Sequence, residues 1–212
     1  MIKDNLEKVQ IRINNVNHTQ SVTLVAVSKT RSIDELQQVI DVGQQHFAEN
    51  YLQEALIKIN HLKSQNLIWH FIGPIQSNKT LKIAQNFDWV HSIDRLKIAQ
   101  RLNDQRSKNL PKLKVLLQIN IDNEATKSGV LVKQIDELVT QFESLKNLTL
   151  RGFMCIPNSS NSAQSFARMA NIIKQYSNLD VLSMGMSHDL ESAITHGATF
   201  VRVGTDIFGK RI

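Results

Sequence analysis

The segment Thr23-Leu-Val-Ala-Val-Ser-Lys29-Thr30 is a short apolar run that ends in a lysine. Side chains alternate between the two faces of a β-strand, so Val25, Val27 and Lys29 share one face. A lysine at the end of an apolar row either extends into solvent or is partly removed from water. An amine that is removed from water has a lowered pKa and becomes a nucleophile toward carbonyl groups. The segment alone favours a lysine that extends into solvent, and the choice between the two alternatives depends on the rest of the chain.

Seven further segments of the same kind follow along the chain, and helical sequence separates them. The eight predicted strands are 23–29, 46–50, 67–73, 89–93, 114–121, 148–156, 181–186 and 200–204. Helices are predicted at 3–17, 32–43, 51–62, 78–85, 94–105, 131–144, from 161 onward and at 189–196. A capping box, Ser32 with Glu35, begins the second of these helices. After the last strand only a short tail remains.

Strands that alternate with helices of this length form right-handed crossovers and a parallel sheet. Eight such units close into a barrel more readily than they form an open sheet. We therefore predict an α/β protein with a single (β/α)₈ barrel domain over residues 1–212 and an extra N-terminal helix. The alternative is an open doubly wound sheet, which is disfavoured because no Gly-x-Gly-x-x-Gly turn follows the first strand.

The composition is that of an ordinary globular protein, with 42% hydrophobic and 21% charged residues. The net charge of +6 permits binding of anions, but the basic residues are scattered, so we expect no nucleic acid partner. The single cysteine, Cys155, suits a reducing compartment. No signal peptide or membrane-spanning segment is apparent, and the histidines lack metal-ligand spacing. We expect a cytoplasmic protein with no metal and no membrane contact.

Polar or small residues recur at the predicted carboxyl ends of the strands, which form the reactive face of a barrel. They are Lys29, Asn50, His70 with Gly73, Ser92, Asn120, Met154, Ser183 with Met186, and Arg202 with Gly204. Their coincidence predicts a pocket at this face. Met154, Met184 and Met186 are expected to fill the barrel. His70 is expected either to lie against a ligand or to be a hydrogen-bonded core residue.

The last two strands carry the signs of a phosphate site. Loops after strands seven and eight are where barrels most often bind phosphate. Gly204 lets backbone N–H groups approach an anion, and Ser183 and Thr205 add hydroxyl donors. Together with Lys29 and an inward Arg202, these are the parts needed to hold pyridoxal 5′-phosphate as a Schiff base. A guanidinium at the pyridine nitrogen keeps its proton, so the cofactor would be a weak electron sink.

The chain resembles the pyridoxal phosphate homeostasis proteins (the YggS/PROSC type) over nearly its whole length. The shared motifs are Leu24-Val-Ala-Val-Ser-Lys29, Phe47-Ala-Glu-Asn-Tyr-Leu-Gln-Glu54, Trp69-His-Phe-Ile-Gly-Pro-Ile-Gln-Ser-Asn-Lys79, His91-Ser-Ile-Asp-Arg95, Lys127-Ser-Gly129, Arg151-Gly-Phe-Met154, Leu182-Ser-Met-Gly-Met-Ser187 and Val201-Arg-Val-Gly-Thr-Asp-Ile-Phe-Gly209. The chain departs from the family pattern at Ala48, where glycine is usual, and at His188, where an acidic residue is usual.

The resemblance implies a barrel related to the N-terminal domain of alanine racemases, with the cofactor on Lys29. It also implies that Asn50 lies beside the ring substituents and that Arg202 faces the ring nitrogen. Lys127 occupies the position of a family lysine suspected of cofactor hand-over. The full predicted cofactor site is Lys29, Asn50, His70, Ser183, Arg202, Gly204 and Thr205, and no catalytic residue is assigned.

Family members bind the cofactor, lack a firmly established activity, and influence vitamin B6 and amino-acid pools. The resemblance therefore implies a cofactor carrier, with pyridoxal phosphate-dependent apoenzymes as candidate partners. A racemase or lyase is the main alternative, but racemisation needs an acid or base on each face of the substrate. In the related racemases a second domain, absent from this sequence, supplies one of them. Since the same domain pairs racemase subunits, we expect a monomer.

Overall fold

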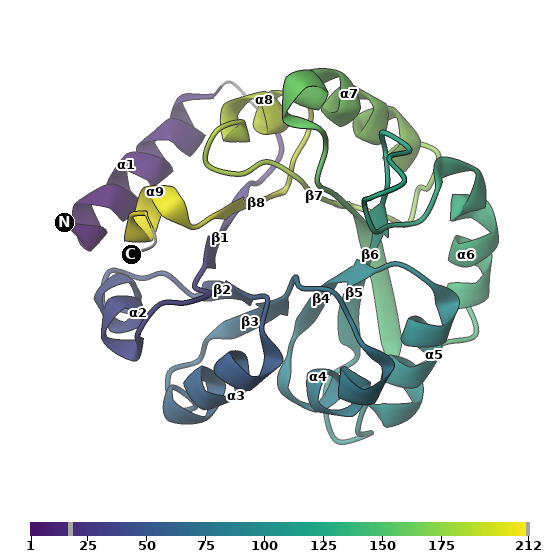
Figure 1. The fold of residues 1–212 in the computed structure, drawn as a ribbon, viewed down its shortest axis with the longest axis horizontal. Helices are drawn as coiled ribbons and strands as arrows, with labels where there is room; N and C mark the ends of the chain where they lie inside the picture. The colour runs from purple at the N-terminus through teal and green to yellow at the C-terminus, as the bar shows by residue number, and fades with distance from the viewer. Residues whose placement is uncertain (17–18, 211–212) are drawn as a thin grey trace.

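Eight parallel strands close into a barrel in the computed structural model, which describes residues 1–16 and 19–210 (Figure 1). Each strand pairs with the next one in the chain, and β8 returns to pair with β1. The strands are β1 (Thr23–Val27), β2 (His46–Glu49), β3 (Ile68–Phe71), β4 (Trp89–Ile93), β5 (Leu113–Ile119), β6 (Leu148–Cys155), β7 (Val181–Ser183) and β8 (Phe200–Val203). The predicted (β/α)₈ barrel is confirmed, and the open sheet is excluded.

Helices surround the barrel, as Figure 1 shows. They are α1 (Ile2–Asn15), α2 (Ile33–Ile40), α3 (Leu52–His61), α4 (Thr80–Asn86), α5 (Leu96–Gln105), α6 (Ile135–Phe142), α7 (Ser162–Ile173), α8 (Leu190–Thr195) and α9 (Thr205–Phe208). The predicted capping box at Ser32 is present, with reciprocal bonds between Ser32 and Glu35. The extra N-terminal helix is confirmed up to Asn15, whereas Asn17, its predicted last residue, lies outside the described residues. The tail after β8 forms the short helix α9, which the sequence did not predict.

Most strands end earlier than predicted, and after two of them, β1 and β7, the backbone turns at a left-handed residue. β1 ends at Val27 rather than at Lys29, and Thr30 has a left-handed φ of 64°. β7 ends at Ser183 rather than at Met186, and Gly185 has a φ of 90°. A left-handed residue cannot continue an extended strand. Lys29 and Met186 therefore lie on loops above the barrel.

The apolar core has two layers, which follow the alternation of side chains along the strands. The smaller layer fills the barrel and consists of Val25, Ala48, Trp89, Leu116, Met154, Val181 and Phe200, with Val27 packed against it. The larger layer lies between the strands and the helices and includes Leu24 and Ala26. Lys29 thus follows the inward row of β1, as the alternation predicted.

The prediction that three methionines fill the barrel is correct only for Met154, which belongs to the inner layer. Met184 packs in the outer layer, and Met186 is 41% exposed. Met184 follows the inward Ser183, so alternation points it outward, and Met186 lies beyond the left-handed turn at Gly185.

Helix α1 lies outside β1 and β8, beside α8 and α9 (Figure 1). Arg12 of α1 donates to Glu191 at 2.6 Å, to Asp206 at 2.5 Å and to the Ser187 carbonyl at 2.9 Å. These three acceptors belong to α8, to α9 and to the loop after β7. A single guanidinium therefore joins the extra helix to the segments that follow the last two strands.

Candidate functional site

A pocket of about 210 Å³ opens at the carboxyl ends of β1 and β8, beside the loop after β7. Its lining contains three cationic side chains and two hydroxyl groups but no carboxylate. The lining residues are Val27, Lys29, Arg31, Met186, Ser187, His188, Arg202, Gly204 and Thr205. The pocket therefore suits an anionic ligand.

Lys29 is half-buried, and the residues on both sides of it are held by acidic side chains. The hydroxyl of Ser28 donates to Glu49 Oε1 at 2.7 Å. The backbone N–H of Thr30 donates to Glu54 Oε1 at 2.5 Å. Since the chain is anchored immediately before and after Lys29, the lysine enters the pocket from a fixed backbone.

A buried ion pair supports this anchor. Lys58 Nζ donates to Glu49 Oε1 at 2.7 Å, to Glu54 Oε1 at 2.6 Å and to the Ser28 carbonyl at 2.6 Å. The side chains of Lys58 and Glu49 are 4% and 0% exposed. Burial raises the pKa of Glu49, and the charge of Lys58 and the bonds from Lys58 and Ser28 oppose this rise. The sequence analysis did not find this pair, because its partners are nine residues apart on a strand and a helix.

Arg202 enters the pocket from the inward row of β8 and is only 4% exposed. It donates to Ser183 Oγ at 2.7 Å and to the Cys155 carbonyl at 3.0 Å. No carboxylate among the described residues lies within ion-pair distance of it. Burial accordingly lowers the pKa of this guanidinium, which still remains a cation at neutral pH.

Gly204 and Thr205, at the start of α9, line the pocket. The N–H groups of Thr205 and Asp206 have no acceptor within the described part of the protein. The turn is tight, since a Cβ on Gly204 would lie 3.1 Å from the Val27 carbonyl oxygen. Close packing of β8 on β1 thus favours glycine here, and the N–H groups that follow are free to bind an anion.

The structure brings four of the predicted site residues together in this pocket: Lys29, Arg202, Gly204 and Thr205. Ser183 is fully buried and bonds to Arg202 and to His91, so it lies behind the arginine rather than on the pocket wall. The serine that lines the pocket is Ser187, four residues further along. Both serines belong to the motif Leu182-Ser-Met-Gly-Met-Ser187. Because β7 ends at Ser183, this serine stays inside the barrel, whereas Ser187 lies on the following loop.

Asn50 and His70 lie elsewhere. Asn50 lines a neighbouring pocket of about 260 Å³, together with Lys127 and Asn120, and its Oδ1 is buried without a partner in the described structure. His70 is fully buried in the barrel and hydrogen-bonds to His46 and His91. Its ring stacks on Trp89 at a centroid distance of 5.7 Å. Of the two interpretations of His70, the hydrogen-bonded core residue describes its contacts.

The sequence analysis also missed Arg31 and His188 as lining residues. Arg31 bonds to Glu35 and to the Gly209 carbonyl, while His188 is exposed at the rim. Neither residue lies on a strand, so the strand pattern carried no signal for them. Among the described residues, no group of three His, Cys, Asp or Glu side chains could hold a metal ion.

The fold and the pocket define a (β/α)₈ barrel protein of the alanine racemase N-terminal type. The family model for the alanine racemase N-terminal domain matches residues 2–211. Alanine racemase of Clostridium difficile has a similar fold, with a TM-score of 0.75 at 15% identity over 98% of this chain and 57% of that one.

Relatives with a higher sequence identity define the family more specifically. The pyridoxal phosphate homeostasis protein of Escherichia coli K12 is 47% identical over 91% of this chain and 87% of its own length. That of Pseudomonas aeruginosa is 48% identical over 99% and 96%. This chain therefore belongs to the pyridoxal phosphate homeostasis protein family.

The fold of the solved relative PipY agrees with this assignment. PipY of Synechococcus elongatus, with pyridoxal phosphate bound, has a TM-score of 0.86 at 32% identity and covers 99% of this chain and 100% of its own. No helix in the described part of the chain is long and apolar enough to cross a membrane.

Proposed function

We propose that this protein binds pyridoxal 5′-phosphate covalently through Lys29 and acts in vitamin B6 homeostasis, by holding the cofactor and supplying it to other proteins. The observation that carries the proposal is the composition of the Lys29 pocket, which combines an amine, a guanidinium and hydroxyl groups with no carboxylate. The names of the relatives and the cofactor bound to PipY support the same ligand.

The residues present fit this cofactor. Its aldehyde matches the Lys29 amine, which forms a C=N bond with the aldehyde carbon as water leaves. Its phosphate matches the hydroxyls of Ser187 and Thr205 and the backbone N–H of Thr205 at the start of α9. Arg202 would face the ring nitrogen of the cofactor. We assign Asn50 of the neighbouring pocket to the ring substituents, and we assign Ser183 to the support of Arg202 instead of the phosphate.

A carrier is favoured over a racemase or lyase. When bound, the cofactor supplies an electrophilic carbon and an electron sink, and a guanidinium beside the ring nitrogen weakens that sink because it keeps its proton. Racemisation also needs a second acid or base. Among the described residues that line the pocket, His188 carries the only imidazole, thiol or phenol group, and its side chain is exposed. We therefore expect slow or absent amino-acid turnover.

Absorption spectroscopy tests the covalent link. We expect purified protein with pyridoxal phosphate to show a visible absorption band, which Lys29→Ala abolishes. Lys127→Ala is the matched control, because Lys127 lines the other pocket, and the band is expected to remain. A wild-type protein that shows no band after incubation with the cofactor would refute the proposal.

A transfer assay tests the homeostatic role. Loaded protein is mixed with a pyridoxal phosphate-dependent apoenzyme, and the recovered activity of that enzyme is measured. We expect transfer from the wild type and none above background from Lys29→Ala after the same loading and desalting. Rapid racemisation of amino acids by the loaded wild type, lost in Lys29→Ala, would instead establish the racemase.

A further inference from the structure

A continuous chain of hydrogen bonds crosses the inside of the barrel from Arg202 to His46. Arg202 Nη1 lies 2.7 Å from Ser183 Oγ, and Ser183 Oγ lies 2.9 Å from His91 Nδ1. His91 Nε2 is 2.8 Å from His70 Nδ1, and His70 Nε2 is 3.0 Å from His46 Nδ1. The five residues come from β8, β7, β4, β3 and β2, and each lies on the inward row of its strand. The chain therefore spans the barrel interior.

The two ends of this chain open into different pockets. Arg202 lines the Lys29 pocket at the carboxyl ends of the strands. His46, the first residue of β2, lines a second pocket of about 420 Å³ together with Thr23 at the start of β1. The three residues between them are fully buried. Each bonded pair is within ordinary hydrogen-bond distance, so the series of hydrogen bonds between the two pockets is unbroken.

The donors and acceptors can be assigned in one direction. A guanidinium can only donate, so Ser183 Oγ accepts from Arg202. Within the described structure the Ser183 hydroxyl has no acceptor except His91 Nδ1, so it donates there. A neutral imidazole has one donor and one acceptor nitrogen, which makes His91 donate from Nε2 to His70 and His70 donate from Nε2 to His46. The opposite direction would leave the buried Ser183 hydrogen without a partner, which is unfavourable.

This direction suits the buried charge of Arg202. Every group in the chain turns a lone pair toward the guanidinium and a hydrogen away from it. Such an alignment of dipoles stabilises a cation that has no carboxylate partner. All three histidines must then be neutral. Burial lowers the pKa of His70 and of His91 well below the usual value, and the neighbouring imidazoles and Arg202 add to this.

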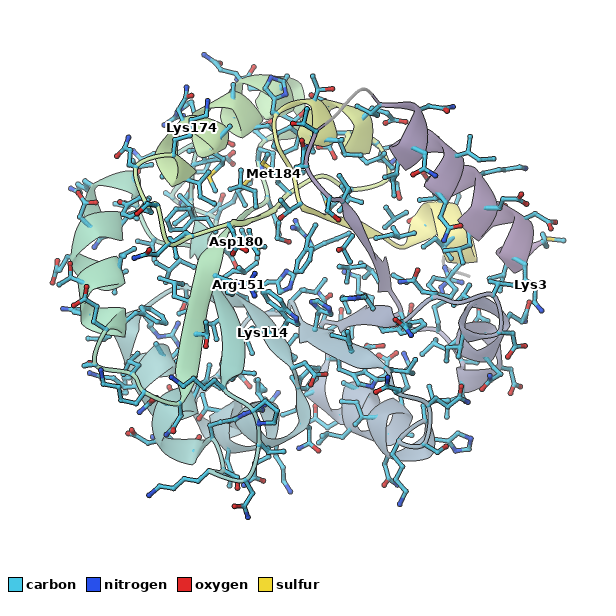
Figure 2. All side chains as sticks on the ribbon, turned by 180° about the vertical axis from the view of Figure 1, so that it is seen from behind. Lys3, Lys114, Arg151, Lys174, Asp180 and Met184 are labelled. Atoms are coloured by element: carbon cyan, nitrogen blue, oxygen red, sulfur yellow. The ribbon has the colours of Figure 1, made fainter. Side chains whose placement is uncertain are left out.

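The end at His46 is the part of the chain that solvent can protonate, because His46 is only partly buried. Burial and the charge of Lys114 lower its pKa, and Asp88 opposes them. Lys114 and Arg151 lie over the Trp89 ring, and Arg151 is paired with Asp180. Figure 2 places Lys114, Arg151 and Asp180 near the barrel axis. A protonated His46 would carry hydrogen on Nδ1 and could not accept from His70.

We propose that Ser183, His91, His70 and His46 form a one-way hydrogen-bonded relay that positions Arg202 and couples its surroundings to the protonation of His46 at the opposite end of the barrel. When His46 gains a proton, either its bond to His70 breaks or His70 and His91 exchange tautomers. In the second case Ser183 receives hydrogens from both sides. Ser183 and the histidines are positioning residues, since only Arg202 lines the Lys29 pocket.

NMR of protein labelled with ¹⁵N-histidine tests the relay without cofactor, so its outcome does not depend on the proposed function. At pH 8 we expect the Nε2–H tautomer at His46, His70 and His91. As pH falls, we expect the nitrogen shifts of His91 to change with the same midpoint as those of His46. An Nδ1–H tautomer at His91 at pH 8, or a His91 signal that ignores the titration of His46, would overturn the proposal.

Two pairs of variants localise the effect. His46→Gln keeps an acceptor for His70 but cannot titrate, so the pH response of His91 should vanish. His61→Gln, at the exposed end of α3, should leave that response intact. Ser183→Ala should shift the Nδ1 signal of His91, while Ser187→Ala should leave it unchanged. A His46→Gln protein that retains the pH response of His91 would refute the coupling.

The same variants can be compared after loading with pyridoxal phosphate. This experiment rests on the proposed function. We expect the visible band of the wild type to shift with pH at the midpoint measured for His46, and the shift to be absent in His46→Gln. A wild type with the expected tautomers but no visible band would refute cofactor binding and retain the relay. A band whose pH dependence is identical in His46→Gln would refute the coupling to the pocket.

Discussion

Replacing Lys58 with methionine is expected to destabilise the protein strongly, because it leaves the carboxylate of Glu49 buried and unpaired. Both side chains are almost fully buried, and Lys58 donates three hydrogen bonds. Removal of one partner of a buried ion pair typically costs about 3–5 kcal/mol. The free energy of unfolding of a domain is roughly 5–15 kcal/mol, so a large share of the stability would be lost at pH 8.

The loss should depend on pH in a defined direction. Burial already raises the pKa of Glu49 in the native state, and removal of the Lys58 charge raises it further. A carboxyl group whose pKa is higher in the folded state than in the unfolded state destabilises the protein as pH rises above the unfolded value, about 4.3 for glutamate. We therefore expect Lys58→Met to be more stable at pH 5 than at pH 8, and to differ less from wild type at pH 5.

Urea unfolding followed by circular dichroism at pH 5 and pH 8 measures this effect. In the double variant Glu49→Gln with Lys58→Met no buried charge remains and Ser28 keeps its acceptor, so we expect most of the stability to return. Glu54→Gln, at the more exposed carboxylate, should cost only about 1 kcal/mol. A loss below about 1 kcal/mol for Lys58→Met, equal at both pH values, would refute the reasoning, since a broken buried pair is worth several times more.

Three further outcomes are expected. Gly152→Ala should prevent folding or destabilise the protein severely, because its Cβ would lie 1.9 Å from the Val181 carbonyl oxygen. Gly43 has open space around it and a φ of 95°, so Gly43→Ala should lower the free energy of unfolding, measured by thermal unfolding, by only about 1–2 kcal/mol. Burial raises the pKa of Cys155 to about 12, so the thiol should resist alkylation at pH 8 in the native protein and react in urea. Arg12→Gln should weaken cofactor binding and lower the melting temperature, because it releases α9 and the loop after β7 from α1. Calorimetry measures both effects, and equal cofactor affinity of the wild type and Arg12→Gln would refute this role of the extra helix.

Much of the fold could be predicted from the sequence. The period-two pattern of β1 placed Val25 and Val27 on one face and Leu24 on the other, and in the structure these faces are the inner and the outer layer of the core. The capping box at Ser32 marked the start of α2 correctly. These features are local, because the strand period and a cap depend on residues that are close in the chain. The number and order of such segments were then sufficient to predict a closed barrel.

The shared pocket of Lys29, Arg202, Gly204 and Thr205 followed from the same argument, because parallel strands bring their carboxyl ends to one face of a barrel. The role of Ser183 did not follow, since it depends on where β7 ends. Ser183 is the last inward residue of the strand and bonds Arg202, whereas the serine that lines the pocket is Ser187, on the loop after β7. That difference of four residues is set by the left-handed turn at Gly185.

The sequence by itself determined the alternation of strands and helices, the inward row that leads to Lys29, and the family. Only the tertiary structure decided which buried polar groups meet. Glu49 and Lys58 are joined across a strand and a helix, and the path from Arg202 to His46 uses five strands. A residue spacing in sequence carries no information about such pairs, because closure of the barrel sets the distances between the inward side chains of separate strands.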